Sequence, residues 1–593
     1  MENTIFTNVY FVPKASGTHA DVFMAYGFAR LMERLLLEAK RGDPTASIRV
    51  SLKDVGPYYI IRLSEPLRED SLGKIEFPAD LVPFVSSRKS PAPSGAIPSR
   101  DVDEVWERVR FYNEQRNALY DKNLKVSEIR DQLSDYEPPH DWQIVVCLGD
   151  WRMQAQDIYN RIVTQWQKSE SIWQEHVRVI LELMATIGIK NEVLEKWKKN
   201  ANKQGIEVKV TASQLLNPHQ GKGQNKTKSR SLRMENIDRS WVEEFLKTIG
   251  LWFCMMPRQI LGKNNNDWKI YVISPKNLSL SQTREAYRRF SRYIWQERRR
   301  DTTSLKTDIT SILLFYKAWL DYVEIALGGT DDFDVELARP ENVVAGFYTV
   351  QYKPLSQNAY TMVNQSFLHL PEWGSTIQTK EDVNLVKQMI DEHLEVIRSI
   401  EEDHSDGYDL LRLYRDFVAG ENWRAFFEFT SAFAQDVMRR MNQNQQYVSL
   451  FSAPHLRRLM MTQKKFSEIL KREGFQNVAY AIRHSTIIPQ GRKAKGQDYL
   501  YEIRYGLGAE FKRKSTVKEE FLTALSEFMQ SYNQENAQTL EKTGNQMRKD
   551  LRTSDIQDVV ELVDEFGSEV VANLLIAYGY AREPREDETT FQL

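Results

Sequence analysis

The sequence predicts an α+β fold class, with a mixed α/β N-terminal body over residues 1–380 followed by an all-α helical-bundle C-terminal domain. Runs rich in β-branched and aromatic residues alternate with helical patterns in the first part. After Lys380 the hydrophobic residues recur almost wholly at helical spacing. The chain has 593 residues, 41% of them hydrophobic, enough for roughly two to four domains. We expect connecting helices over 381–455, a separable helical bundle over 456–582 and an acidic tail over 583–593.

Hydrophobic periodicity predicts the first elements. Residues 20–40 form an amphipathic helix, because their apolar side chains recur at helical spacing (Phe23, Tyr26, Leu31 and Leu35). Residues 47–63 read as two short strands about an Asp-Val-Gly-Pro turn. The Pro/Ser-rich segment 83–99 predicts a loop, because packing against a core would not by itself keep such a segment ordered.

The remaining elements follow from shorter patterns. The apolar run 143–149 predicts a buried strand, and residues 153–199 predict helices. Three more segments predict strands, namely 251–261, 267–274 and 343–353, the first two joined by the polar turn 262–266. In the helical part, the acidic segment 401–409 and the Gly/Lys segment 491–496 predict loops.

A basic segment interrupts the body. Residues 196–233 contain ten basic residues and one acid, Glu207. Gly, Asn, Ser and Lys at that density cannot bury enough apolar surface to fold alone, so the segment predicts a flexible loop. Its cations are candidate nucleic-acid ligands: Lys222, Lys226, Lys228 and Arg230.

Charge is sorted by position near the C-terminus. Residues 464–518 contain thirteen Lys or Arg and five acids, whereas 519–593 contain six basic and sixteen acidic residues. Segregated cations suit a polyanion, because each one that meets a phosphate releases condensed counterions. The alternative is a solvated basic helix face balanced by the acidic one. The candidate contacts are Lys464, Lys465, Arg483, Arg492, Lys493, Lys495, Lys512, Arg513 and Lys514.

An arginine-rich helix is expected over residues 283–300. At helical spacing Arg284, Arg288, Arg292 and Arg299 fall within about 80° of one another, with Arg289 beside them. Tyr287, Phe290 and Ile294 lie on the roughly opposite side and would dock the helix. Arginine is the preferred side chain for bidentate phosphate contacts. Salt bridges to acidic neighbours are the structural alternative.

The turn between the two predicted strands carries a row of amides. Lys263, Asn264, Asn265 and Asn266 would form a tip on a rigid base. Asn can pair bidentately with adenine, which suits a reader of base edges in a groove. Equally, Asn simply tolerates the left-handed backbone of a turn.

Enzyme-like patterns are few. His140–Asp141 lies in a Pro-rich context, without the further ligands that a metal-dependent phosphohydrolase needs. The segments 328–334 and 401–409 read as acidic loops, since their spacing fits neither a two-metal nor a Ca²⁺ site. Walker, GxSxG and HExxH motifs do not occur. The sequence thus predicts no catalytic residue, no metal site and no cofactor.

Composition also predicts a location. Two distant cysteines, Cys147 and Cys254, exclude a disulfide framework and suit a reducing cytoplasm. Neither a secretory signal nor an apolar run long enough to span a bilayer is present. We therefore expect a cytoplasmic protein without a membrane partner.

Four stretches together resemble the large subunit of a type I CRISPR Cascade, closest to subtype I-B and its transposon-associated variants. They are AQDIYNRIVTQW (155–166), WKIYVISPKNLSL (268–280), LLRLYRDFVAGENWRAFFEFTSAFAQDVMRRM (410–441) and the region 477–536. The likeness extends in phrase and order over most of residues 150–580 and is weaker before them. It consists of patterns of residue type and contains no catalytic signature.

The resemblance implies a non-catalytic subunit of an RNA-guided DNA-binding complex. Such subunits contact the 5′ handle of the guide RNA, read the protospacer-adjacent motif on target double-stranded DNA and contact the displaced strand. They sit beside the backbone and handle-binding subunits and recruit a helicase-nuclease or a transposition factor. In several subtypes a small subunit is made from an internal start, for which Met460 or Met461 is the candidate here.

Two other readings stay open. Asp331 and Asp332 could belong to a degenerate nucleotidyl-transferase-like enzyme. Alternatively, the chain is a helical scaffold protein whose basic faces only balance acidic ones.

Overall fold

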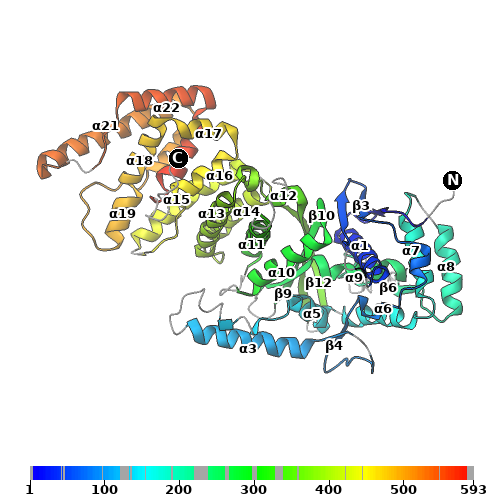
Figure 1. The fold of residues 1–593 in the computed structure, drawn as a ribbon. Coiled ribbons are helices and arrows are strands. Elements are labelled where there is room, and N and C mark those ends of the chain that lie inside the picture. The colour runs from blue at the N-terminus through cyan, green and yellow to red at the C-terminus, as the bar shows by residue number, and fades with distance from the viewer. Residues whose placement is uncertain are drawn as a thin grey trace, which may run out of the picture. The chain divides into compact units, whose positions relative to one another are not determined.

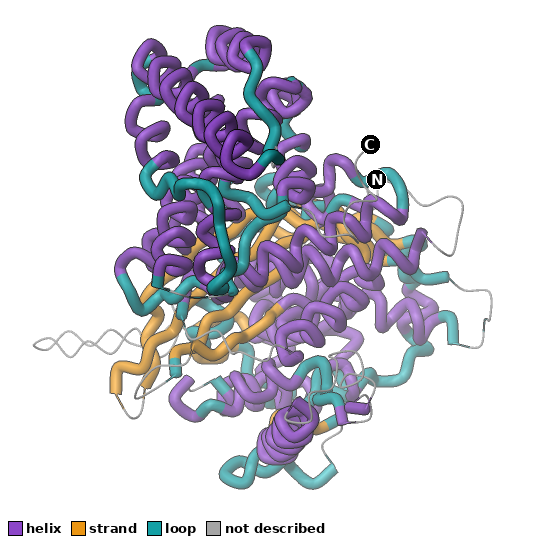
Figure 2. Tube along the Cα trace, turned by 90° about the vertical axis from the view of Figure 1, so that its left-hand side faces the viewer, coloured by secondary structure: helices purple, strands orange, loops and turns teal. Residues whose placement is uncertain are grey.

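The computed structural model describes most of the chain. The described residues are 5–41, 43, 47–95, 98–120, 132–133, 136–153, 155–188, 191–218, 238–260, 266–296, 303–327, 338–356, 359–420, 422–443, 445, 447–545 and 548–583. They confirm the predicted fold class, because sheets and helices alternate up to His369 and the described residues after it are helical or irregular (Figures 1 and 2). The chain forms two compact units. Unit 1 comprises 1–307, 314–322 and 340–369, and unit 2 comprises 308–313, 323–339 and 370–593.

The first sheet of unit 1 is antiparallel, with strand order β1-β3-β2-β10. Its strands are β1 (Val9–Pro13), β2 (Val50–Asp54), β3 (Tyr58–Leu63) and β10 (Asn277–Ser279). The two strands predicted over 47–63 are confirmed as β2 and β3. Their turn is closed by the Asp54 carboxylate, which accepts from the Gly56 amide at 2.8 Å, and Gly56 has a φ of +89°.

The second sheet is also antiparallel, with order β12-β11-β9-β8. It consists of β8 (Met255–Ile260), β9 (Asp267–Pro275), β11 (Val344–Ser356) and β12 (Ala359–His369). The strand predicted at 251 begins later, because Leu251–Cys254 complete helix α9 (Trp241–Cys254). Both central strands, β9 and β11, match their predicted positions.

Two predictions within residues 83–149 are wrong. Residues 143–149 belong to helix α5 (Trp142–Gly149), whose residues Gln143–Leu148 are all buried. A fully buried helix shows no polar face, so its short apolar run looked like a strand. The segment 83–99 is not wholly a loop, since β4 (Phe84–Ser86) and β5 (Ser99–Asp101) pair in parallel. The Asn160 side chain anchors β4 through both the amide and the carbonyl of Val85.

Helices complete unit 1. They are α1 (His19–Ala39), α2 (Glu69–Leu72), α3 (Val102–Tyr120), α6 (Gln156–Lys168), α7 (Trp173–Met184), α8 (Asn191–Lys203), α10 (Leu280–Gln296) and α12 (Pro340–Val343), with 3-10 turns at Ala79–Leu81 and Trp151–Met153. Helix α11 (Ser304–Leu327) contributes residues to both units. The helix predicted over 20–40 is confirmed as α1. The basic loop predicted over 196–233 is wrong for its first part: α8 and β6 (Lys209–Thr211), paired with β7 (Asp238–Ser240), occupy it.

Helices α1 and α9 of unit 1 pack closely through two glycines (Figure 1). A β-carbon at Gly250 would lie 1.8 Å from the Phe23 carbonyl oxygen, and one at Gly27 would lie 1.8 Å from the Leu246 carbonyl oxygen. Real atoms cannot approach so closely. The close crossing of the two helices therefore requires glycine, which has no side chain, at both positions.

Unit 2 is helical over its described residues after His369. Its helices are α13 (Lys380–Ser399), α14 (Ser405–Val418), α15 (Trp423–Asn442), α16 (Ala453–Met461), α17 (Lys464–Lys471), α18 (Glu473–Ser485), α19 (Ile487–Ala494), α20 (Leu507–Lys514), α21 (Lys518–Thr543), α22 (Thr553–Phe566) and α23 (Ser568–Gly579), with a 3-10 turn at Trp373–Thr376. Two predicted loops are shorter than expected. Residues from Ser405 onward already belong to α14, and α19 extends to Ala494.

Residues on both sides of position 456 share one core in unit 2. Helix α15 packs against α19, α20 and α23. The Phe466 ring lies 5.2 Å from that of Trp423 and 5.3 Å from that of Phe427, measured between centroids. Arg582 donates to the buried Glu392 carboxylate at 2.7 Å. The division into connecting helices and a separate bundle stays a prediction, and this shared core spans its boundary.

No helix in the described parts of the chain is long and apolar enough to cross a membrane.

A buried histidine makes the stability of unit 1 depend on pH. His176 lies beside the stacked rings of Trp197 and Trp241, with centroids 5.8 and 5.2 Å away, and its Nδ1 accepts from the Trp197 indole at 2.9 Å. Burial lowers the pKa of His176 from 6.5 to about 4. The unfolded chain therefore binds a proton between these values that the folded chain excludes. Its stabilisation is complete above pH 6.5 and is lost as the pH falls towards 4.

We expect the free energy of unfolding of unit 1 to fall by roughly 2 kcal/mol between pH 7 and pH 5 because of this group alone. His176→Phe should be less stable at pH 7, since the Trp197 N–H loses its acceptor, but its pH dependence should be flatter by that amount. Urea unfolding at both pH values measures the difference. The exposed His404, replaced in the same way, should leave the slope unchanged, and an equal slope in His176→Phe would contradict the assignment.

Candidate nucleic-acid interface

Four arginines line one pocket in unit 1, which we name the arginine pocket. They are Arg30 on α1, Arg100 on β5, and Arg284 and Arg288 on α10. His140, Asp80, Asp141, Trp252, Phe253 and Tyr287 are among its other lining residues. The volume of the pocket is about 300 Å³, counted as the space open to the centres of water-sized molecules. Helix α10 presents its arginines there because Phe290, on the other side, is buried.

Each arginine of the pocket also has an acidic partner. The Glu33 carboxylate lies 2.7 Å from Arg30 and 2.8 Å from Arg284. Asp141 accepts from Arg100 at 3.0 Å. These two carboxylates are only 9% and 8% exposed, so they contact the guanidinium groups from the protein interior. A guanidinium has five N–H donors, which leaves donors for a further acceptor in front.

Arg288 is the least restrained of the four. Its side chain is 53% exposed, and its contact with the Glu285 carboxylate on the same helix is long, at 3.7 Å. The Phe253 ring lies beneath the guanidinium groups of Arg30 and Arg284, at 5.6 and 6.0 Å from its centroid. The pocket thus combines cations with an aromatic floor, a suitable environment for a phosphate.

Burial disfavours the charged form of His140 at the pocket. Burial lowers its pKa below the usual 6.5; the neighbouring Asp141 opposes this shift, and Arg288 and Arg100 reinforce it. Asp141 is engaged by Arg100. No group of three His, Cys, Asp or Glu residues suited to a metal occurs among the described residues.

The other predicted arginines are placed differently. Arg289 is 20% exposed and bound to Glu285 and to a carbonyl of its own helix, and Arg292 contacts Glu137 at 3.3 Å. The alternative of acidic partners thus holds for all four described arginines of the predicted face. Arg299 lies outside the described residues. Arg30 and Arg100 were missed, because nothing near them in sequence distinguishes them from ordinary surface cations.

Several predicted contacts lie outside the described residues. They are Lys222, Lys226, Lys228, Arg230, Lys263, Asn264 and Asn265, together with Asp331, Asp332 and the segment 328–334. Asn266 is described, and its carbonyl accepts from the Tyr360 hydroxyl at 2.6 Å.

In unit 2 the predicted cations fall into two groups. Arg483 is only 8% exposed and donates to the Tyr578 carbonyl at 2.8 Å, so its prediction as a nucleic-acid contact is wrong. Burial also lowers its pKa. Lys512 is held by Asn573 at 2.9 Å and Lys514 by Glu510 at 2.8 Å. Exposed cations are Lys464, Lys465, Arg492, Lys493, Lys495 and Arg513.

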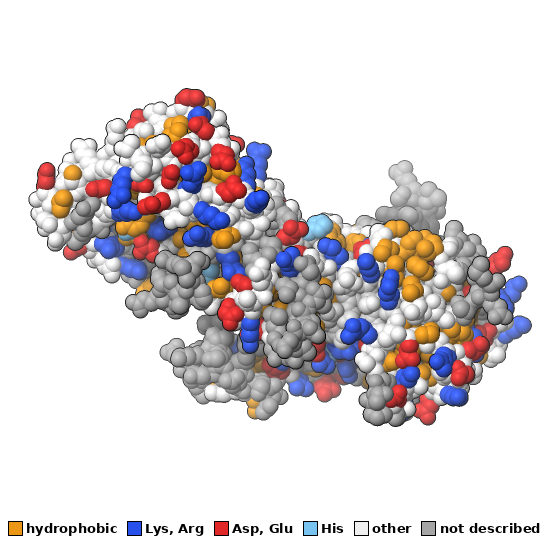
Figure 3. All heavy atoms as spheres, turned by 45° about the horizontal axis from the view of Figure 1, so that its top comes forward, with side chains coloured by type: hydrophobic (Ala, Val, Ile, Leu, Met, Phe, Trp, Pro, Cys, Tyr) orange, Lys and Arg blue, Asp and Glu red, His pale blue; other side chains and the backbone are white. Residues whose placement is uncertain are grey.

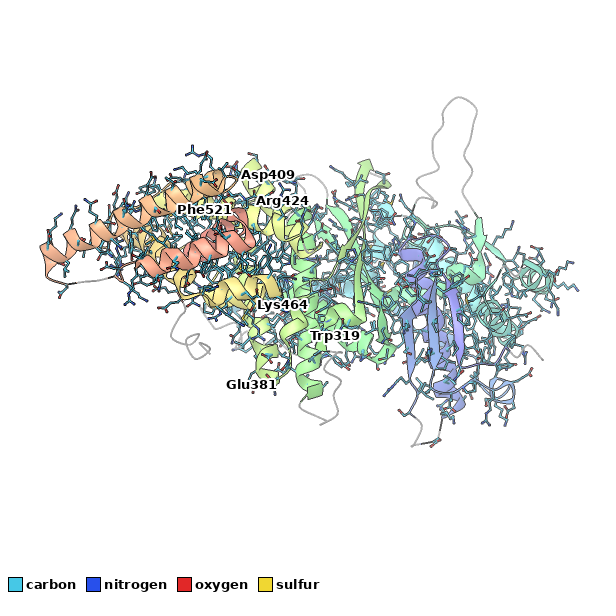
Figure 4. All side chains as sticks on the ribbon, turned by 90° about the horizontal axis from the view of Figure 1, so that it is seen from above. Trp319, Glu381, Asp409, Arg424, Lys464 and Phe521 are labelled. Carbon is cyan, nitrogen blue, oxygen red and sulfur yellow. The ribbon has the colours of Figure 1, made fainter. Side chains whose placement is uncertain are left out.

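On the face of unit 2 that Figure 3 shows, the exposed cations do not form a purely basic surface. Figure 3 shows Lys and Arg interspersed with Asp and Glu on the visible face of the helical unit. Figure 4 labels Lys464, Arg424 and Phe521 on three helices of this unit, α17, α15 and α21. Charge alone therefore does not single out a binding surface.

Exposed tyrosines do single one out. Tyr447 is 82%, Tyr505 47% and Tyr499 42% exposed, which is unusual for large rings. The Lys493 amine donates to the Tyr505 hydroxyl at 2.9 Å, and the Lys495 amine lies 5.9 Å from the Tyr447 ring centroid. Tyr499 is close enough to raise the pKa of Lys493 electrostatically, after the larger effect of Tyr505. With Arg492, these residues form what we name the tyrosine–lysine surface.

This surface borders a groove of about 710 Å³ within unit 2. Tyr447, Arg492 and Lys495 line it, and Asp391 and Glu395 of α13 provide an acidic wall opposite in charge. The sequence predicted the cations and missed the tyrosines, although two Lys followed by three Tyr over 493–505 carry the signal of a stacking platform.

Comparison with known proteins assigns this chain to no family. The chain matches no model of a known protein family, and no curated protein is significantly similar to it in sequence. The resemblance described from the sequence therefore stays a prediction.

Proposed function

We propose that this chain is a non-catalytic nucleic-acid-binding subunit, and that the tyrosine–lysine surface holds a single strand. The observation that carries this is the set of exposed rings beside lysines at the end of α19. Bases stack on tyrosine with about 1–3 kcal/mol each, whatever their sequence, while lysines neutralise phosphates. The arginine pocket supplies a second phosphate contact in unit 1.

The sequence resemblance supports a more specific proposal, namely the large subunit of an I-B-like Cascade. In that role the chain contacts the guide RNA handle, the adjacent motif on duplex DNA and the displaced strand, and recruits a downstream effector. A small subunit starting at Met460 or Met461 belongs to the same proposal. Such a fragment would begin at the end of α16 and lose the α15 side chains that contact Phe466, so it would need another partner to cover that ring.

The double variant Tyr447→Ala, Tyr505→Ala tests the strand-binding surface. Loss of two stacking partners should weaken binding of a fluorescent single-stranded oligonucleotide by at least tenfold, at about 1–3 kcal/mol per base. Tyr408→Ala is the matched control, since Tyr408 is 48% exposed on α14 and does not line the groove beside the tyrosine–lysine surface. Fluorescence anisotropy gives the affinities. Equal affinities in the wild type and the double variant would exclude this surface.

The assembly is tested separately by extracting nucleic acid from the complex purified from its native source. A discrete guide-sized RNA is expected. Absence of such an RNA would reject the Cascade role. The proposal that the tyrosine–lysine surface binds a single strand would then be tested by the tyrosine variants alone.

A further inference from the structure

A second cavity in unit 1 is not used by the proposed function. Aromatic rings from four elements line it: Trp106 and Tyr112 on α3, Trp142 on α5, Trp268 on β9 and Trp295 on α10. We name it the tryptophan cavity. The rings of Tyr112 and Trp295 meet edge to face at 4.7 Å. The centre of a water molecule can move through about 70 Å³ there, several times the roughly 10–15 Å³ that one water needs.

The cavity is aromatic but not apolar throughout. Gln143 lines it and is only 3% exposed. Its Oε1 lies 3.2 Å from Ser291 Oγ, while Nε2 has no hydrogen-bond partner among the described residues. Turning the amide over exchanges the two atoms, so one of them lacks a partner in either orientation. Trp142 Nε1–H, on the same wall, likewise has no partner among the described residues.

Buried polar atoms without partners are costly, and proteins rarely retain them without a use. Two side chains that could form hydrogen bonds therefore stand beside rings that could stack on a flat ligand. Arg116 and Arg258 also line the cavity, where they donate to the carbonyls of Trp295 and Thr307 at 3.1 and 3.2 Å. Their positive charge favours an electron-rich ring bearing acceptor atoms.

The cavity adjoins the arginine pocket through two shared elements. On α10, Arg288 lines the pocket and Trp295 the cavity. Seven residues separate them, about 10 Å along a helix. Asp141 of the pocket directly precedes Trp142 and Gln143 of the cavity in the chain. A nucleotide next to a phosphate bound in the pocket can thus turn its base towards the cavity.

We propose that the tryptophan cavity binds one unpaired nucleobase, stacked on its indole rings and hydrogen-bonded to Gln143 and Trp142. Enzymes that act on a nucleobase extrude it into such a pocket and hold it by stacking and hydrogen bonds, so the same contacts are available to a binding protein. This inference rests on the proposed function insofar as a bound strand supplies the base. A free nucleotide carries the same chemistry, and the experiment separates the two sources.

The test variant is Gln143→Met, which keeps the side-chain length and removes the amide. Two end-labelled strands of equal length and charge are compared, one a homopolymer with bases and the other an abasic deoxyribose-phosphate chain. In the wild-type protein we expect the strand with bases to bind more tightly. Gln143→Met should reduce this advantage on the order of tenfold, the value of a buried hydrogen bond, and leave abasic binding unchanged.

Thermal melting separates this result from misfolding. Since the variant removes a buried amide with an unsatisfied atom, its melting temperature should equal or exceed that of the wild type. Gln204→Met, at an exposed position of unit 1, controls for the substitution. An unchanged advantage of the strand with bases in Gln143→Met would overturn the proposal while strand binding stands.

If neither strand binds, the proposed function fails, and a third experiment tests whether the cavity binds a free nucleotide. The free monophosphate of 2-aminopurine riboside is titrated with protein, because its fluorescence is quenched on stacking. Quenching by the wild type that Gln143→Met loses would assign the cavity to a free nucleotide. Absence of quenching would overturn the base site as well.

Discussion

Replacing Gly250 with valine is expected to unfold unit 1 under conditions in which the wild type is stable. The β-carbon would lie 1.8 Å from the Phe23 carbonyl oxygen and 2.7 Å from the Gly27 amide nitrogen. These are backbone atoms of α1, so no side-chain rotation relieves the clash. Helices α1 and α9 must separate, which exposes the neighbouring core residues Phe23 and Leu246. We expect a loss of roughly 3 kcal/mol or more, a large part of a domain's stability.

Tryptophan fluorescence during urea unfolding measures this effect in unit 1. Eleven of the thirteen tryptophans lie in unit 1, the exceptions being Trp373 and Trp423, so the signal reports mainly on that unit. Gly73→Ala is the matched control, because a β-carbon there would meet its nearest atom at an ordinary 3.6 Å. It should unfold near the wild-type midpoint. Coincident curves for Gly250→Val and the wild type would disprove the close helix crossing.

Reversing the charge of Arg288 is expected to have the largest effect on nucleic-acid binding of any single change in unit 1. Arg288 is the most exposed of the pocket arginines. By contrast, Arg284 and Arg100 hold the largely buried Glu33 and Asp141, so their removal would disturb the fold as well. Arg288→Glu therefore tests binding rather than stability.

The expected result is a loss of about tenfold in affinity at low salt. The slope of log affinity against log salt concentration should also decrease in magnitude by about one, the value of a single phosphate contact. Arg178→Glu provides the control, with the same change in charge at a residue of unit 1 that contacts Glu69 at 3.7 Å. If both variants shift the affinity and slope equally, the effect is one of overall charge and the pocket is not a phosphate site.

The strands that periodicity predicted best alternate buried and more exposed positions, as the two strands over 47–63 do in β2 and β3. The helix over 20–40 became α1 although most of its residues are buried, because the run is too long for a strand. Prediction failed where both that alternation and such a length are missing. In α5 every residue from Gln143 to Leu148 is buried, so no period distinguishes a helix from a strand. Strands β4 and β5 pair with each other in parallel, and the residues between them separate the two partners in sequence. Neither short strand therefore shows a local pattern that would predict the pairing.

The sequence by itself determined the fold class and the residue types that could meet a polyanion. It placed Arg284 and Arg288 on one face of a helix, since a period of 3.6 residues is a local property. Only the tertiary structure brought Arg30 and Arg100 to that face and buried Arg483 against the Tyr578 carbonyl. Burial and long-range pairing depend on which elements pack together, and that choice is made by the whole core rather than by any one segment.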